Sequence, residues 1–278
     1  MTWSKRVLET NRGTFEFFEK GEGPPLAVTH LYSEFNESGD YFADSLIENH
    51  HVYLINLREC GGSEKASAPH QLTMLETVLD LESIRNALGF DRWKFAGHST
   101  GGMIGILYGI YFSDSLTKLL LANTAAREYM TFSKDCIYNE GHPEFVRMQD
   151  LMATLKRGDL TDRERESYTI ERTKLSLFRP QDYHMTFNKN INKKLSAKRL
   201  DFFSRELHTF DVTKKLSLIK APTLIIAGKH DVQCPLLYSQ ELNEAIPHST
   251  CIVFEQSNHY PHLEEVGKFS KVIARDFD

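Results

Sequence analysis

The serine best placed to act as a nucleophile stands in the pentapeptide Gly-His-Ser-Thr-Gly at residues 97–101. A short apolar run, residues 93–96, precedes it and a longer one, residues 102–112, follows, so Ser99 is predicted on a tight turn between a strand and a helix. Glycines two residues before and after Ser99 remove the Cβ atoms that would collide with this strand and helix. The turn strains the serine backbone and holds its hydroxyl out at the edge of the sheet.

A serine nucleophile needs a base that takes its proton, and the base needs an acid that orients it. Asp231 follows the apolar run 221–227, and His259 follows the apolar run 251–254. If both runs are parallel strands, the two loops leave the same edge of the sheet as Ser99, where open α/β sheets bind ligands. The sequence therefore predicts a catalytic triad of Ser99, Asp231 and His259, in that chain order.

Three further histidines lie close to these residues in the sequence. His262 competes with His259 for the role of base, but it stands beyond Pro261, at the expected start of the last helix. His259 is therefore the favoured base, since it is nearer to the strand end. His98 and His230 are interpreted as flanking residues.

Apolar strand-like runs alternate with helical patterns along the chain, which indicates an α/β fold with a mostly parallel sheet. The sheet is expected to have eight strands flanked by helices. The strand-like runs are 8–18 (a hairpin that turns at 11–13), 26–29, 52–55, 93–96, 119–122, 223–227 and 251–254.

Residues 126–210 interrupt this alternation with helical patterns, many charges and no convincing strand. We predict a core formed by residues 1–125 and 211–278, with residues 126–210 inserted after the sixth sheet strand as a helical cap, or lid, over the sheet edge. The alternative is an independent helical domain unrelated to catalysis. Candidate pocket-facing side chains of the cap are Tyr129, Phe132, Phe145, Met148, Leu151, Met152, Phe178 and Tyr183.

The composition of this 278-residue chain, 41% hydrophobic and 26% charged, is that of a globular enzyme. A net charge of −5 provides no basic field for nucleic acid. The longest apolar run, residues 103–112, is shorter than the roughly 18 to 20 residues that span a bilayer. We therefore expect a cytoplasmic protein with a small-molecule substrate as its partner, no nucleic acid and no membrane. Whether it is a monomer or a homodimer stays open.

The four cysteines form no Cys-x-x-Cys pair and have no zinc-site spacing, so no metal is predicted. They are interpreted as reduced thiols that serve packing. The predicted triad chemistry also needs no cofactor.

Together these motifs resemble the α/β-hydrolase superfamily, and within it the lid-bearing esterase, proline iminopeptidase and carbon–carbon hydrolase branch. The resemblance covers nearly the whole chain. The matching segments are Thr29-His30 with Asn36, residues 56–63, residues 97–102, residues 221–231, and His259 with Glu264. The resemblance implies that two backbone amides bind the oxyanion, that of Thr100 and that of Tyr32.

The chain also departs from the family pattern. Leu31 and Glu59 stand where the family usually has glycine, and Asn56 replaces the usual aspartate. Leu31 directly precedes Tyr32, so we expect its side chain to narrow or tilt the oxyanion loop at the Tyr32 amide and not at that of Thr100.

The sequence predicts a serine hydrolase that cleaves a small ester, thioester or amide through an acyl-enzyme. A proline iminopeptidase-type aminopeptidase and a carbon–carbon bond hydrolase are alternatives; for the former, Glu140 or Glu144 of the insertion could bind a substrate ammonium. A non-catalytic scaffold that binds a small ligand is a third reading.

Overall fold

A computed structural model describes residues 2–278 and contains an eight-stranded sheet with the order β1-β2-β5-β3-β6-β7-β9-β10. β1 pairs antiparallel with β2, and β2 antiparallel with β5, whereas the pairs from β5 through β3, β6, β7 and β9 to β10 are parallel. The expected α/β fold with a mostly parallel, eight-stranded sheet is confirmed. Its strands are β1 (Ser4–Thr10), β2 (Gly13–Lys20), β3 (Pro25–Val28), β5 (His51–Ile55), β6 (Trp93–His98), β7 (Leu116–Ala122), β9 (Thr223–Gly228) and β10 (Ser249–Phe254).

Helices cover both faces of this sheet. The α-helices are α1 (Tyr41–Asp44), α2 (Met74–Ala87), α3 (Thr100–Phe112), α4 (Phe145–Leu155), α5 (Asp162–Lys174), α6 (Tyr183–Thr186), α7 (Ala197–Glu206), α8 (Leu236–Ala245), α9 (Pro261–Glu264) and α10 (Val266–Asp276). Buried side chains of α2, α3 and α8 pack on one face, and those of α1 and α10 pack on the other.

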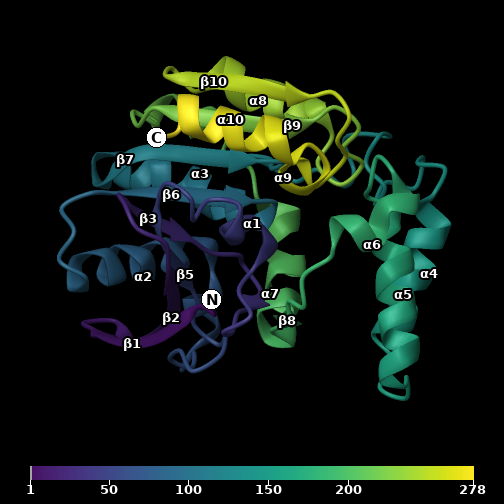
Figure 1. Ribbon diagram of the computed structural model, residues 1–278, viewed down its shortest axis with the longest axis horizontal. Helices are drawn as coiled ribbons and strands as arrows, with labels where there is room; N and C mark the ends of the chain where they lie inside the picture. The colour runs from purple at the N-terminus through teal and green to yellow at the C-terminus, as the bar shows by residue number, and fades with distance from the viewer. Residues whose placement is uncertain (1) are drawn as a thin grey trace.

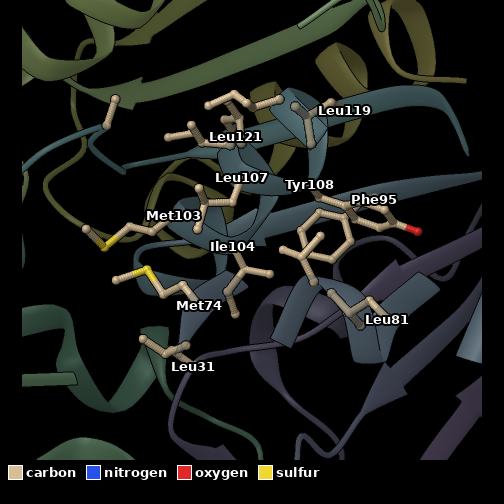
Figure 2. Packing of buried hydrophobic residues seen from close by; sticks show 14 of the residues in the cluster. Leu31, Met74, Leu81, Phe95, Met103, Ile104, Leu107, Tyr108, Leu119 and Leu121 are labelled. Atoms are coloured by element: carbon tan, nitrogen blue, oxygen red, sulfur yellow. The ribbon is translucent and has the colours of Figure 1, made fainter. Parts of the chain in front are cut away.

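The hydrophobic core consists of two layers, one on each face of the sheet, because successive side chains along a strand point to opposite faces. In β6, Phe95 faces the α3 side and Ala96 the α10 side; in β7, Leu119 and Leu121 face α3 whereas Leu120 faces α10. Figure 2 shows Phe95, Leu119 and Leu121 packed against α3 side chains such as Ile104, Leu107 and Tyr108. Because both faces of the parallel strands are covered, their sequences read as continuous apolar runs.

Residues 126–210 contain α4 to α7 and leave and rejoin the sheet domain at one place. Glu128 N donates to Phe210 O at 2.8 Å, and Val212 N donates to Ala126 O at 2.8 Å. Figure 1 shows α4, α5 and α6 beyond the sheet edge at which the strand arrows end, with α7 close to that edge. The insertion therefore lies at the end of the sheet where ligands bind in open α/β folds.

One expectation for this segment is wrong, because residues 126–210 do contain a strand. β8 (Lys194–Leu195) pairs antiparallel with β4 (Ser33–Glu34) in a separate two-stranded sheet. Its two residues are both exposed, so no alternation of polar and apolar side chains could reveal it.

No helix within residues 2–278 is both long enough and apolar enough to cross a membrane.

Candidate active site

Ser99 forms the turn between β6 and α3 with a strained backbone. Its φ of 55° and ψ of −123° are unusual for a residue other than glycine, and its amide donates to Ala122 O at 2.9 Å. A Cβ added at Gly97 would lie 2.2 Å from Gly101 O, and one at Gly101 would lie 2.4 Å from Thr29 O. Gly97 therefore permits the close approach of β6 to α3, and Gly101 permits that of α3 to the segment that follows β3.

Asp231 and His259 are hydrogen-bonded to each other and almost completely buried. His259 Nδ1 lies 3.0 Å from both Oδ1 and Oδ2 of Asp231, as the sequence-based pairing of these residues anticipates. An ionised carboxylate can only accept, so this bond assigns the proton to Nδ1 and leaves Nε2 free to take a proton. This arrangement is the one that a general base requires.

The Asp231 carboxylate also accepts hydrogen bonds from three other donors. Gln233 N and Cys234 N donate to Oδ1 at 2.8 and 3.0 Å, and Asn123 Nδ2 donates to Oδ2 at 2.7 Å. Buried charge is tolerated where such donors replace water. They also fix the plane of the carboxylate, and hence the direction in which it holds His259.

Sequence reasoning missed Asn123. It follows β7 directly, adopts a φ of 49°, and donates through Nδ2 both to Asp231 and to Asn258 O. The sequence does carry a signal for it, because an asparagine directly follows an apolar strand run that ends at the same sheet edge as Ser99. Asparagine also tolerates left-handed backbone better than most residues, which suits it to such a turn.

Ser99 and the Asp231–His259 pair lie at this edge without a hydrogen bond between them in residues 2–278. No hydrogen bond within residues 2–278 joins the Ser99 hydroxyl to His259, although the neighbouring His98 ring lies 4.7 Å from the His259 ring. Hydrogen bonds between catalytic groups are often loose in unliganded enzymes, so this geometry still allows proton transfer.

His98 does more than flank the serine, contrary to expectation. Its Nε2 lies 2.7 Å from the carbonyl oxygen of His259, so it supports the loop that carries the base. Burial, followed by the proximity of His259, lowers the pKa of His98 well below its usual value. His98 is therefore neutral at physiological pH and does not repel a protonated His259.

His262 sits in α9 among aromatic rings and does not contact Asp231. Its ring lies 5.2 Å from that of Phe42, and its Nδ1 is buried with no hydrogen-bond partner within residues 2–278. Burial lowers the pKa of His262 to about 3. His262 therefore lacks the orienting acid that His259 has. His230, the other flanking histidine, stacks on Phe178 at 4.6 Å between ring centroids.

Glu264 holds the His259 loop against the insertion. Its Oε2 accepts from Asn258 N at 2.8 Å, and its Oε1 accepts from Phe178 N at 2.6 Å. His259 N in turn donates to Ser176 O at 3.2 Å. The loop that carries the candidate base is thus bonded directly to residues of the 126–210 segment.

The amides proposed to bind an oxyanion are those of Thr100 and Tyr32. Thr100 is the first residue of α3, so its N–H has no acceptor inside the helix. Within residues 2–278, the Tyr32 N–H donates to no protein atom, whereas its carbonyl accepts from Ser196 N at 2.9 Å. Both amides are available as donors, which is what an oxyanion hole requires.

Arg199 of α7 positions the segment that precedes Tyr32, and sequence reasoning missed it. It is 2% exposed, and its guanidinium donates to Leu31 O, to Arg58 O at 3.0 Å and to Thr77 Oγ1 at 2.8 Å. Every nitrogen of this buried cation therefore has an acceptor. The insertion thereby supports the candidate oxyanion loop.

We expect Arg199→Met to lower the free energy of unfolding by about 3–5 kcal/mol, because three buried acceptors lose their donor. Urea denaturation followed by circular dichroism measures the loss. Arg205→Met is the matched control on the same helix. Arg205 pairs with Asp201, and the two side chains are 70% and 73% exposed, so we expect a change within about 0.5 kcal/mol. Equal small effects for both variants would contradict the structural role of Arg199.

The three residues that depart from the family pattern each have neighbours that accommodate them. Leu31 is buried in the core cluster, and Figure 2 places it near Met74. Glu59 adopts a φ of 70°, the conformation that favours glycine, while its Oε1 accepts from Lys198 Nζ at 2.6 Å. The buried Asn56 accepts from Phe35 N at 2.7 Å through its side chain. Polar bonds to neighbouring segments therefore stabilise these residues in place of the family's usual ones.

Comparison with known proteins adds three relatives. A sequence profile of the family described as alpha/beta hydrolase fold matches residues 29–266. The structure of an alpha/beta fold family hydrolase from Bacillus anthracis is 39% identical, with a TM-score of 0.95 and 99% of each chain covered. A putative carbamate hydrolase from Pseudomonas savastanoi pv. phaseolicola is 25% identical over 90% of this chain and 92% of its own. A proline iminopeptidase from Saccharolobus solfataricus is 24% identical over 79% and 73%, respectively.

Proposed function

The chain belongs to the α/β-hydrolase family, and from this premise we propose that it is a serine hydrolase that cleaves a small ester, thioester or amide through an acyl-enzyme. The observation that carries the proposal is the buried Asp231–His259 hydrogen bond beside the strained turn of Ser99. Nucleophile, base and orienting acid are the parts that acyl transfer needs.

In the proposed reaction, Ser99 Oγ attacks the carbonyl carbon of the substrate while His259 Nε2 takes its proton. The amides of Thr100 and Tyr32 bind the oxyanion that forms, and loss of one such donor typically costs about 2.7–4 kcal/mol. His259 then gives the proton to the leaving group, and water releases the acyl group by the same steps. Asp231 keeps Nδ1 protonated throughout.

We also propose that residues 126–210 act as the cap of this site. Several hydrogen bonds tie the segment to the loops of the candidate triad, among them His259 N to Ser176 O, Ile137 N to Val232 O, and Tyr138 OH to Gln233 Oε1. The prediction that Phe132 faces the pocket is wrong. Its side chain is 67% exposed and lies beside Arg127, because the chain there runs over the surface. Phe187, which the sequence did not single out, packs on Tyr260 at 5.4 Å.

An aminopeptidase is the second candidate, because relatives named proline iminopeptidase cover most of the chain. Its substrate ammonium would need an acid in the cap. Glu140 is exposed and Glu144, about half exposed, lies 3.8 Å from Arg147, so neither presents a buried unpaired carboxylate. Ester hydrolysis is therefore favoured over aminopeptidase activity. Carbon–carbon bond hydrolysis and ligand binding without catalysis remain alternatives, and a panel of substrates distinguishes them from ester hydrolysis.

A hydrolysis panel tests the proposal, with acyl esters of graded chain length, proline and other aminoacyl amides, and a vinylogous 1,5-diketone. We expect turnover of short-chain esters at kcat/KM well above that of the amides and the diketone. Turnover of the proline amide alone would establish the peptidase. No turnover, together with no labelling by a fluorophosphonate probe, would indicate a binding scaffold.

The same panel tests the cap. Phe187→Ala should change the relative kcat/KM across chain lengths, by about 1–3 kcal/mol for each methylene accommodated or rejected, and leave acetyl ester hydrolysis nearly unchanged. Phe132→Ala removes the same ring from the exposed surface of the cap and should leave the profile of the wild type. An identical change for all substrates in Phe187→Ala would contradict a role of this cap residue in specificity.

A further inference from the structure

Arg172 lies in the last turn of α5, at the end of the helix that precedes Ser176. Ser176 stands four residues later, two beyond the end of the helix, and is bonded to the loops of both the acid and the base. Its carbonyl accepts from His259 N at 3.2 Å, and its hydroxyl accepts from Gln233 Nε2 at 2.9 Å. Because only three residues separate Arg172 from Ser176, Arg172 stands at the end of α5 that adjoins the catalytic loops.

The guanidinium of Arg172 has no protein partner. Its Nε is shielded from solvent and unbonded, and no carboxylate within residues 2–278 lies within 4.0 Å of it. The Nη groups keep access to solvent and likewise donate to no atom of residues 2–278. Arg199 of the same cap is the contrast, because each of its nitrogens has an acceptor. A partly buried arginine without acceptors is costly and calls for an explanation.

The side chain of Gln233 links this end of α5 to the tyrosines near the candidate triad, because it donates to Ser176 Oγ at 2.9 Å and accepts from Tyr138 OH at 2.9 Å. For each of Tyr32, Tyr138 and Tyr260, burial raises the pKa, and the charge of Arg172 is the largest influence that opposes the rise. Tyr32 supplies the proposed oxyanion amide, and the Tyr260 ring lies 5.2 Å from that of His259. These tyrosines are neutral at physiological pH, so they do not neutralise the charge of Arg172.

We propose that Arg172 binds a carboxylate of the substrate, so that the preferred substrate is an anionic ester such as the half-ester of a dicarboxylic acid. The planar fork of an arginine matches a carboxylate, and both Nη groups and Nε are free to donate. The cap would then select the charge of the substrate while the sheet domain carries out the cleavage. This inference rests on the proposed hydrolase function and adds the substrate class.

The kinetic test compares monomethyl succinate, glutarate and adipate with the methyl esters in which the free carboxylate is replaced by a carboxamide of the same shape. We expect kcat/KM of the wild type to favour one of the carboxylates by about 10- to 100-fold over its carboxamide, as hydrogen bonds to a charged group imply. Arg172→Gln should lose this preference because its rate falls much further on the carboxylate than on the carboxamide, and Arg172→Lys should keep part of the preference. Arg163→Gln, an exposed arginine on the same helix, is the control and should keep the whole preference.

A binding measurement separates failure of this inference from failure of the hydrolase proposal. Calorimetric titration of Ser99→Ala with the same half-esters should show binding that is weakened at least about tenfold in Ser99→Ala/Arg172→Gln. Three results would overturn the role of Arg172. The first is the same kcat/KM preference for carboxylate over carboxamide in the wild type and in Arg172→Gln, and the second is an equal loss of kcat/KM on charged and neutral esters. The third is equal affinity of the half-esters for Ser99→Ala and Ser99→Ala/Arg172→Gln. Binding that depends on Arg172, without turnover of any ester by the wild type, would instead overturn the hydrolase proposal alone.

Discussion

Ser99→Ala should abolish acyl-enzyme formation and leave the fold intact. The substitution removes one oxygen and keeps the Cβ, so the turn with φ of 55° carries the same strain as before. Loss of a serine nucleophile typically lowers kcat by a factor on the order of 10⁶. Intact-mass spectrometry after treatment with a fluorophosphonate probe measures the effect: the wild type should gain one adduct, and Ser99→Ala none. Circular dichroism should show the same thermal transition for both proteins.

The control for this prediction is Ser167→Ala, an exposed serine on α5 that should leave labelling and turnover unchanged. Peptide mapping of the labelled wild type should place the adduct on Ser99. An adduct that persists on another serine in the Ser99→Ala protein, with turnover retained, would remove Ser99 from the mechanism.

The second large effect is expected for His259→Ala, which should lower kcat/KM by about 10⁴- to 10⁶-fold. His259 is the imidazole bonded to Asp231 at 3.0 Å, and its removal leaves Ser99 without a proton acceptor. His262→Ala should lose far less activity, since the His262 ring packs beside Phe42 without an acid partner. Steady-state kinetics on the best ester of the panel gives both values.

Because His262 is buried, its removal also leaves a cavity, so thermal unfolding of both variants must accompany the kinetics. A folded His262→Ala protein with nearly full activity supports the assignment of His259 as base. The opposite ranking, with His259→Ala active and His262→Ala inactive although folded, would move the base to His262.

Local patterns in the sequence were sufficient for the parts of this protein that depend on neighbouring residues. The apolar runs predicted the strands because buried parallel strands are apolar on both faces, and the glycines at 97 and 101 predicted the turn of Ser99 because a Cβ would collide at either position. Asp231 and His259 could be paired because each follows a strand run, and parallel strands end at one edge of the sheet. Their hydrogen bond agrees with that pairing, whereas their catalytic roles stay predictions.

Only the tertiary structure shows which polar groups have partners. Arg172 and Arg199 both belong to helices of the insertion, and nothing in their local sequence distinguishes them; yet Arg199 is bonded to residues far away in the chain and Arg172 to none within residues 2–278. Asn123 likewise acquires its role from Asp231, which lies 108 positions later. The physical reason is that side-chain periodicity reports the burial of a residue within its own element, whereas a hydrogen bond across the fold depends on how separate elements pack.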